Sequence, residues 1–165
     1  VLNIKNLLHS TLELYATRAK EEGIVLILDS KENHEVEAIH THVSQILMNL
    51  MQNSFYAIHQ SEKKWISLKS YTSGHDVIIE VTDSGPGIDK ALQDVIFDPF
   101  FTTKESGEGT GLGLSVSKKL AEKNGGSLSL DPTSTETKFI LRLKQARKSS
   151  PEQPKGSPTR LPLTS

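Results

Sequence analysis

Two glycine-rich turns, separated by a phenylalanine-rich block, constrain the fold of this chain more than any other feature. The first turn spans residues 83–88 (DSGPGI) and the second spans residues 107–113 (GEGTGLG). The block between them, residues 97–104 (FDPFFTTK), holds three of the five phenylalanines. Glycines permit tight turns and close backbone approaches, so a strand, an irregular segment and then a helix are expected here. A carboxylate opens the first turn and a helix follows the second, which describes the two ends of one binding pocket.

Composition excludes several classes of protein. A length of 165 residues suits one domain with a hydrophobic core. A net charge of −1 gives no reason to expect nucleic-acid binding. The sequence shows no apolar run of about 20 residues and no signal peptide. The lack of cysteine removes disulfides and thiol chemistry and fits a reducing compartment. We therefore expect a cytoplasmic location, although the full-length protein could be membrane-anchored.

The two ends of the chain differ from its middle. The chain begins at Val1 rather than at methionine, so we expect a fragment of a longer protein. Residues 146–165 carry four prolines among Ser, Thr, Lys and Arg, with little apolar content. Such a segment buries too little surface to offset its ordering entropy. We predict a disordered tail, with a proline-motif docking peptide as the alternative.

Hydrophobic spacing predicts the order of helices and strands. The first helix ends at Gly23, and one of its faces carries the apolar residues Ile4, Leu7, Leu8, Leu12 and Tyr15. The later elements are a buried strand over 24–28, a helix over 41–60, a hairpin over 65–71 and 77–81 that turns at 73–74, a helix from Gly111 to 124–126, and an antiparallel pair over 127–130 and 138–143. This order predicts an α/β (α+β) two-layer sandwich, in which about three helices cover one face of a mixed, mostly antiparallel sheet.

The second predicted helix has an unusual polar face. No Asp, Glu, Lys or Arg occurs between residues 38 and 61, and Asn49 and Asn53 lie one helical turn apart. Asparagine is a poor helix former, so two at this spacing need a reason. One interpretation is a polar contact between helices, or chance. The other is a metal and phosphate site, because the amide oxygen is a hard neutral ligand that suits Mg²⁺.

The first glycine turn can recognise adenine. Asp83 stands at the end of an apolar run, where its carboxylate can accept a hydrogen bond from the exocyclic amino group of adenine. Guanine has an acceptor at that place, so two acceptors would be left unpaired. A plain tight turn is the alternative.

The second glycine turn can bind phosphate. The backbone N–H groups of such a loop and the positive end of the following helix attract phosphate oxygens. A Walker A loop is excluded because no Gly-Lys followed by Ser or Thr is present, and a dinucleotide fingerprint is excluded because Val116 replaces its third glycine. The strand lysine and the HRD and DFG elements of a protein kinase are also missing. A structural hinge is the alternative.

These four segments, in this order and spacing, resemble the N, G1, F and G2 boxes of the ATP-binding domain of sensor histidine kinases. That domain belongs to the GHKL superfamily and has the Bergerat fold. The resemblance implies that Asn53 binds Mg²⁺ with Asn49 as a supporting amide, and that Thr137 supports the contact of Asp83 with adenine through water. The F box would anchor an ATP lid, in which Lys104 neutralises a phosphate. Many family members have Lys, Arg or His where this chain has Tyr56. The F box and short lid look most like the nitrogen-regulator type.

The complete ATP site implied by the resemblance, in which Asn53 is the metal ligand, consists of Asn49, Asn53, Tyr56, Asp83, Gly85, Gly87, Ile88, Phe97, Thr102, Thr103, Lys104, Gly109, Thr110, Gly111, Leu112, Gly113, Leu114 and Thr137.

The acceptor histidine of such a kinase is missing from this sequence. His34 is the only histidine followed by Glu, and it stands in a short polar segment after a predicted strand, so we expect a solvated loop histidine. Residues 1–22 would be the end of a linker or dimerisation helix packed on the domain, and residues 23–145 the ATP-binding catalytic domain. The fragment would bind ATP without its own catalytic acceptor.

The implied function is that of the catalytic domain of a two-component sensor histidine kinase, which transfers the γ-phosphate of ATP to a histidine on a separate dimerisation domain. The implied partners are ATP or ADP, that phosphoacceptor domain and a response regulator receiver domain. The fragment would be a monomer and the full-length protein a homodimer. One alternative is a nucleotide-binding regulatory scaffold without phosphotransfer. Another is a hydrolysing GHKL ATPase, which is disfavoured because Asn49 stands where those enzymes use a Glu to activate water.

Overall fold

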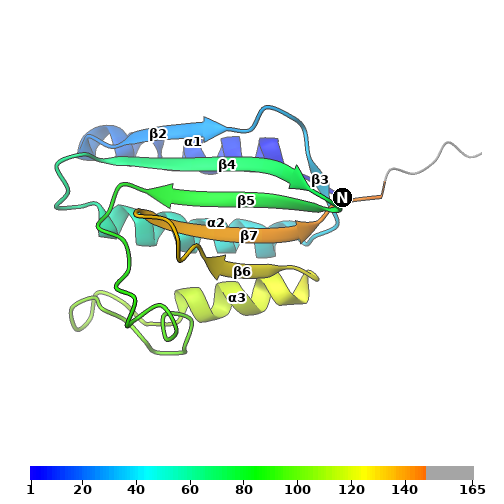
Figure 1. Ribbon diagram of the computed structural model, residues 1–165. Helices are drawn as coiled ribbons and strands as arrows, with labels where there is room; N and C mark the ends of the chain where they lie inside the picture. The colour runs from blue at the N-terminus through cyan, green and yellow to red at the C-terminus, as the bar shows by residue number, and fades with distance from the viewer. Residues whose placement is uncertain (148–165) are drawn as a thin grey trace, which may run out of the picture.

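The computed structural model describes residues 1–147, in which three helices cover one face of a five-stranded sheet and two short strands form a second, small sheet (Figure 1). The helices are α1 (Ile4–Glu22), α2 (His40–Ala57) and α3 (Gly113–Lys123). The strands of the five-stranded sheet, in spatial order, are β2 (Val25–Asp29), β4 (Trp65–Ser73), β5 (Asp76–Asp83), β7 (Thr137–Lys144) and β6 (Ser127–Leu130). Only β2 and β4 run parallel. The predicted two-layer sandwich with a mixed sheet is confirmed.

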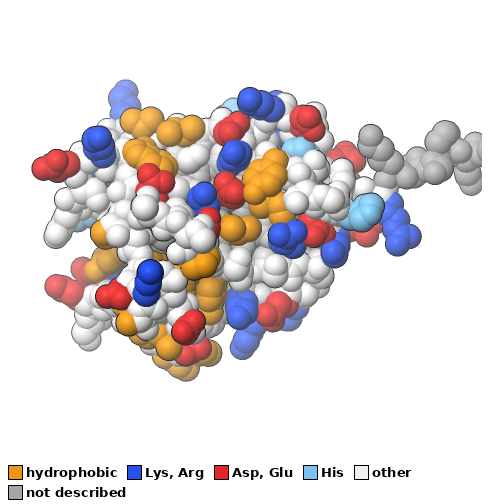
Figure 2. Space-filling model, in the orientation of Figure 1, with side chains coloured by type: hydrophobic (Ala, Val, Ile, Leu, Met, Phe, Trp, Pro, Cys, Tyr) orange, Lys and Arg blue, Asp and Glu red, His pale blue; other side chains and the backbone are white. Residues whose placement is uncertain are grey.

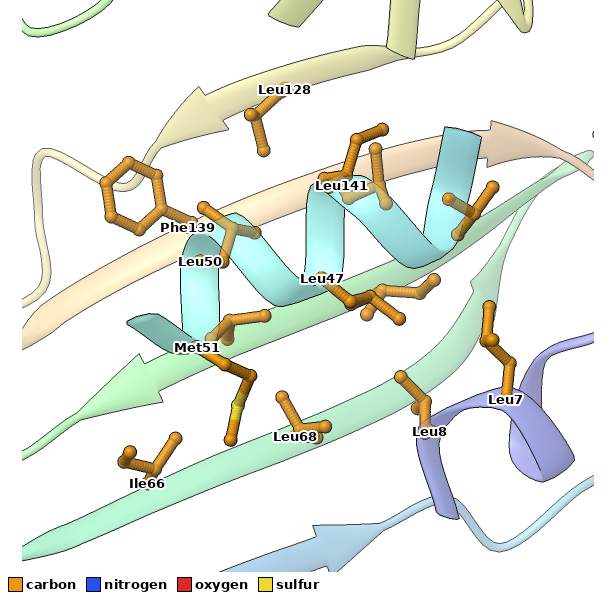
Figure 3. Close-up of a cluster of buried hydrophobic side chains, with 14 of the residues drawn as sticks. Leu7, Leu8, Leu47, Leu50, Met51, Ile66, Leu68, Leu128, Phe139 and Leu141 are labelled. Carbon is orange, nitrogen blue, oxygen red and sulfur yellow. The ribbon is translucent and has the colours of Figure 1, made fainter. Parts of the chain in front are cut away.

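The core lies between the sheet and the helices. The apolar residues of α2 that pack against the sheet are all buried, including Leu47, Leu50 and Met51. Figure 3 shows these side chains facing Ile66 and Leu68 of β4, with the α1, β6 and β7 residues around them. Helix α1 contributes Leu7 and Leu8 to this same core. The positions of α2 and β5 are therefore fixed by buried apolar contacts before any polar residue of the site is considered.

Strand β2 differs from the prediction of a buried strand. Ile24, just before it, is buried, but Val25 is 60% exposed and Ile27 is 41% exposed. The strand lies at the edge of the sheet, and its side chains alternate between the two faces. Leu26 and Leu28 pack against the core while Val25 and Ile27 lie on the open face. The apolar run therefore formed the predicted strand, but only one face of that strand is buried.

A small second sheet was not predicted. Strand β1 (Leu2–Asn3) pairs antiparallel with β3 (Glu35–Val36), and the backbone N–H of Ala146 donates to the carbonyl of Glu35 at 2.8 Å. This pairing buries His34, which is 4% exposed and whose carbonyl accepts from the N–H of Ile4 at 2.8 Å. The prediction that His34 is a solvated loop residue is wrong, because β3 folds back onto the start of the chain.

The helix ends follow the sequence signals closely. Gly23 ends α1 in the left-handed conformation (φ 69°), as predicted. Helix α3 begins two residues after the expected Gly111 and ends at Asn124. The Asn124 side chain also fixes α2: its oxygen accepts from the N–H of Ile39 at 2.8 Å, and its nitrogen lies 3.1 Å from Nδ1 of His42. The end of α3 therefore caps the start of α2.

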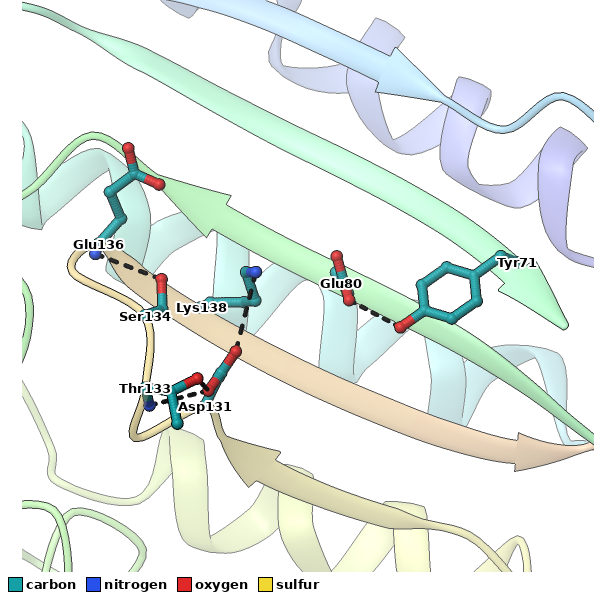
Figure 4. Close-up of polar contacts among 7 residues, drawn as sticks. All are labelled: Tyr71, Glu80, Asp131, Thr133, Ser134, Glu136 and Lys138. Atoms are coloured by element: carbon teal, nitrogen blue, oxygen red, sulfur yellow. Dashed lines mark hydrogen bonds and ion pairs between the residues drawn. The ribbon is translucent and has the colours of Figure 1, made fainter. Parts of the chain in front are cut away.

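The open face of the sheet is mixed in character. Figure 2 shows side chains of both charges and hydrophobic side chains interspersed over this face. Asp76 pairs with Arg142 at 3.1 Å and with Lys144 at 2.8 Å, and Tyr71 donates to Glu80 at 2.8 Å (Figure 4). Among residues 1–147, no helix is both long and apolar enough to cross a membrane. The predicted disordered tail, apart from Ala146 and Arg147, lies outside the described residues.

Candidate nucleotide-binding site

The predicted site residues come from three elements and one long connection. Asp83 is the last residue of β5, Asn49 and Asn53 lie in the C-terminal half of α2, and Gly113 begins α3. Residues 84–112 connect β5 to α3 without a helix or strand of their own and lie beside the start of α3 (Figure 1). Helix α2 contacts both β5 and α3, so it lies between the two ends of the predicted site.

Asp83 is a buried carboxylate with several polar groups close to it. Its side chain belongs to a residue only 2% exposed, and Oδ1 accepts from the backbone N–H of Gly85 at 2.9 Å. The hydroxyls of Ser54 on α2 and Thr137 on β7 lie near this carboxylate and favour its ionised form. Thr137 lies directly opposite Asp83 in the register of β5 and β7. The structure thus brings Thr137 to Asp83, as the resemblance implied.

Burial raises the pKa of Asp83 to about 6, and the nearby charge of Glu136 contributes to the rise. Ser54, Gly85 and Thr137 oppose this rise because they stabilise the ionised form. A pKa near 6 leaves the carboxylate mostly ionised at pH 7. The group is therefore a strong acceptor in a poorly solvated place, which is the chemistry that recognition of an amino group requires.

Gly85 is needed because the first turn passes close to α2. A Cβ at Gly85 would lie 2.7 Å from Oδ1 of Asp83 and 3.3 Å from Cβ of Ala57. Gly87 has a left-handed backbone (φ 79°) that disfavours other residues. The turn therefore forms a cradle that any side chain would fill, beside the buried carboxylate.

Asn49 makes the polar contact between helices that the sequence left open. Its Nδ2 donates to the carbonyl of Gly113 at 3.2 Å and to Oγ of Ser117 at 3.0 Å. Ser117 is fully buried. The Asn49 amide therefore ties α2 to the first turns of α3, where the phosphate-binding amides were predicted.

Asn53 faces a cation. Nζ of Lys104 lies 3.5 Å from Oδ1 of Asn53 and 4.8 Å from the ring centroid of Tyr56. Burial lowers the pKa of Lys104, and the charge of Glu108 acts in the opposite direction. Asn53, Tyr56 and Lys104 thus meet at one point, as predicted for the phosphate end. They come from two segments that are far apart in sequence.

The loop from Thr102 to Thr110 is mostly exposed. Two of its hydroxyls accept local hydrogen bonds: Thr102 from the N–H of Lys104 at 3.1 Å, and Thr110 from the N–H of Leu112 at 3.3 Å. Thr103 is exposed. A Cβ at Gly109 would lie 2.8 Å from Cδ of Lys104, so this glycine lets the lysine side chain pass.

The phenylalanine block anchors this loop only in part. The Phe97 ring meets Phe139 edge-on at 6.2 Å, and Phe101 packs against the core. Phe100 is 75% exposed and has a left-handed backbone (φ 67°), so its expected role as an anchor is wrong. A Cβ at Gly111 would overlap the Phe100 backbone, which explains why glycine is required at that crossing.

The start of α3 presents backbone amides. Leu112 precedes the helix, Leu114 is half-buried, and no side chain within residues 1–147 caps this terminus. N–H groups at a helix start carry partial positive charge and bind anions. Together with Lys104, this terminus makes one end of the site attractive to phosphate.

A hollow of about 260 Å³ lies beside the first glycine turn, away from the phosphate end. Gly87, Ile88 and Thr137 line it, together with loop residues such as Asp131 and Glu136, but no residue of α2 or α3 does. Figure 4 shows this loop held by its own contacts, in which Asp131 accepts from the N–H of Thr133 at 2.9 Å. The structure therefore separates these residues from Asn53 and Lys104.

Two serines and one acid were missed from the sequence. Ser54 and Ser117 are buried and contact Asp83 and Asn49, and Glu136 affects the pKa of Asp83. Ser54 follows the core spacing of Leu47, Leu50 and Met51, so a polar residue on an apolar stripe was an available signal. Ser117 and Glu136 gave no comparable signal, because their roles depend on contacts between distant segments.

Comparison with known proteins agrees with this geometry. The family model described as "Histidine kinase-, DNA gyrase B-, and HSP90-like ATPase" matches residues 38–147. The sensor histidine kinase ZraS of Escherichia coli (strain K12) is 38% identical over 128 residues, which is 77% of this chain and 27% of that protein. The chain thus spans about a quarter of the length of this relative.

Solved structures of histidine kinases have the same fold as this chain. The catalytic domain of histidine kinase ThkA superposes with a TM-score of 0.77 at 30% identity, covering 87% of this chain and 95% of that domain. A second ThkA structure, in complex with the response regulator protein TrrA, gives a TM-score of 0.71 at 27% identity, covering 88% of this chain and 41% of that chain. With the carboxylate, glycine turns and paired asparagines in place, the chain belongs to the family of histidine kinase-, DNA gyrase B- and HSP90-like ATPases, as an ATP-binding catalytic domain of the sensor histidine kinase kind.

Proposed function

We propose that this domain binds Mg²⁺–ATP and, within its full-length protein, donates the γ-phosphate to a histidine on a separate dimerisation domain. One observation carries the proposal: adjacent residues of α2 serve the two ends of the site. Asn53 faces Lys104, and the hydroxyl of Ser54 lies near the buried carboxylate of Asp83 and favours its ionised form. A ligand with an amino group at one end and phosphates at the other matches this arrangement.

The residues present fit a magnesium ion. Asn53 would hold it, because its oxygen is hard and neutral and lies 3.5 Å from the ammonium of Lys104, with its lone pairs toward a cation. Magnesium would neutralise charge on the phosphates during transfer. Lys104 and the N–H groups at the start of α3 would bind the remaining phosphate oxygens.

The specificity for adenine rests on Asp83. Its ionised carboxylate can accept a hydrogen bond, and Gly85 lets the turn pass close to it without a side chain in between. The backbone N–H of Gly85 donates to the carboxylate, and Ser54 and Thr137 favour its ionised form. The protein therefore contributes position and charge rather than a covalent step, which is typical of phosphoryl transfer.

The partners of the full-length protein follow from this proposal. The acceptor would be a dimerisation domain in a homodimer, and the response regulator would then take the phosphate. The ThkA complex with a response regulator supports such a partner. A cytoplasmic location, a monomeric state for the fragment and the nitrogen-regulator type stay predictions.

Hydrolysis is the less favoured alternative. The Asn49 amide cannot act as a general base, and its nitrogen already donates to Gly113 and Ser117. Asn49→Glu would install the carboxylate of the hydrolysing relatives but would turn an oxygen toward the Gly113 carbonyl. We expect this variant to lose stability and to gain at most partial ATPase activity.

A phosphotransfer experiment tests the proposal. Alone, the domain should neither phosphorylate itself nor turn over ATP at an appreciable rate. Mixed with the dimerisation hairpin of its parent and labelled ATP, it should label a histidine there, giving an acid-labile, base-stable phosphate. Normal ATP binding without such labelling would favour the regulatory scaffold, and rapid ATP turnover by the unmodified domain would favour the hydrolysing branch.

A further inference from the structure

We propose that Tyr56 is a positioning residue, which holds the ammonium of Lys104 against Asn53 so that the lid lysine and the divalent cation compete for the same oxygen. This inference rests on the proposed function, since it takes Asn53 as the metal ligand. It adds a role for Tyr56, the position at which this chain departs from the family pattern.

The contacts show how the lysine is held. Nζ of Lys104 lies 4.8 Å from the centroid of the Tyr56 ring, within the range of a cation–π interaction. It also lies 3.5 Å from Oδ1 of Asn53, at the long end of a hydrogen bond. Neither contact is a salt bridge, and no carboxylate among residues 1–147 pairs with Lys104 within 4.0 Å. Because both contacts are weak, the ammonium of Lys104 can leave Asn53 when a metal ion binds there.

The charge pattern of α2 explains why a ring is needed at this position. No charged residue occurs between 38 and 61, so α2 brings no cation of its own to the phosphates. The positive charge beside Asn53 comes instead from Lys104, the last residue of the phenylalanine block. A Lys or Arg at position 56 would repel Lys104, whereas the electron-rich face of a tyrosine ring attracts it. The substitution therefore moves the cation from the helix to the lid.

This competition sets the order in which Lys104 and the metal occupy the place beside Asn53. In the nucleotide-free domain the ammonium takes the place beside Asn53 that the metal needs. When Mg²⁺–nucleotide binds, the metal displaces the ammonium, and Lys104 then becomes available to the phosphates a short distance away. Lid position and metal binding are thus coupled through a single oxygen atom.

Two measurements on three variants test this inference. The first is the rate at which a small amine-specific acylating reagent labels Lys104 in the nucleotide-free domain, followed by mass spectrometry with the exposed Lys119 as internal reference. We expect Tyr56→Leu to raise this rate about fivefold and Tyr56→Lys to raise it at least as much. Tyr56→Phe, which keeps the ring, should label as slowly as the unaltered domain.

The second measurement is the Mg²⁺ concentration that gives half of the metal-dependent gain in affinity for a non-hydrolysable ATP analogue, obtained by calorimetry. Tyr56→Leu should lower this concentration several-fold, because the metal no longer displaces a held ammonium, and Tyr56→Phe should leave it within twofold. Tyr56 is 42% exposed, so the thermal midpoint of each variant should stay close to that of the unaltered domain.

The outcomes separate this inference from the proposed function. Labelling of Tyr56→Leu at the unaltered rate, or failure of Tyr56→Phe to restore slow labelling, would overturn the role of Tyr56 whatever the domain binds. Fast labelling in Tyr56→Leu with an unchanged Mg²⁺ requirement would overturn the competition at Asn53. An unaltered domain that binds no ATP analogue would instead refute the proposed function, while the labelling result would still report on the contact.

Discussion

The two ends of the site are built in opposite ways. The adenine end is buried: Asp83 is 2% exposed, accepts from the backbone N–H of Gly85, and lies beside a turn in which a side chain at Gly85 would clash with it. The phosphate end is open, and its cation rests on a ring and one amide oxygen. A rigid end can reject the wrong base because it cannot adapt, and a loosely held end can rearrange as charge moves. The predictions below test this division.

We expect the largest change in ATP affinity when the carboxylate of the buried adenine end is removed. Asp83→Ala should reduce ATP affinity by about 100-fold or more, because the amino group of adenine would lose a charged acceptor. The unaltered domain should bind ATP far better than GTP. Calorimetry with both nucleotides measures this, and equal affinities for the two in the unaltered domain would refute the assignment of Asp83.

The same carboxylate should make the domain sensitive to pH. Its pKa in the folded state is about 6, above the ordinary value of 3.8, so the folded domain binds more protons than the unfolded chain between these values. This group therefore lowers the free energy of unfolding as pH rises through that window. Relative to the unaltered domain, Asp83→Asn should gain up to about 3 kcal/mol of stability by pH 7.

ATP binding should follow the opposite trend. Below about pH 6 the carboxyl becomes protonated, and affinity should fall about tenfold per pH unit if the ionised form alone accepts from adenine. Denaturant unfolding and calorimetry over pH 4.5–7.5 check both halves. A stability difference between Asp83→Asn and the unaltered domain that does not change with pH would contradict the buried, ionised state of Asp83.

A smaller effect is expected at the boundary between the two ends. Asn53→Ala should remove most of the gain in ATP affinity that Mg²⁺ provides, about tenfold, since its oxygen is the proposed ligand. Asn49→Ala is the matched control one turn away. It should retain much of the Mg²⁺ effect but lose about 1–2 kcal/mol of stability, because Gly113 and Ser117 lose a buried partner. An unchanged Mg²⁺ effect in Asn53→Ala would make this polar face purely structural.

The smallest effect concerns the loosely held end. Residues 102–108 bury little surface, so their amide hydrogens should exchange quickly in the empty domain. An ATP analogue should slow that exchange a few-fold, while β5, already buried, should change little. Exchange in residues 102–108 that is indifferent to the analogue would mean that this loop is not a lid.

The sequence predicted features that carry a local pattern better than features made by contacts between distant segments. The helices, the two hairpin pairs and the glycine turns each carry a local pattern, and all of them were predicted near their observed positions. The β1–β3 pair, the burial of His34 and the exposure of Val25 depend on which segments meet, which no local pattern encodes. The site divides in the same way. Asp83 was recognisable from its turn, but Ser54 and the contact of Lys104 with Tyr56 arise only when separate segments pack together.

The adjacency of Asn53 and Ser54 on α2 has a consequence for ligand length. One residue of α-helix rises only about 1.5 Å, so Asn53 and the Ser54 hydroxyl near Asp83 are held by one rigid helix and do not move independently. Adenosine or AMP would therefore engage Asp83 and leave Asn53 and Lys104 untouched, and affinity should rise in a step, rather than evenly, at the phosphate that first reaches them.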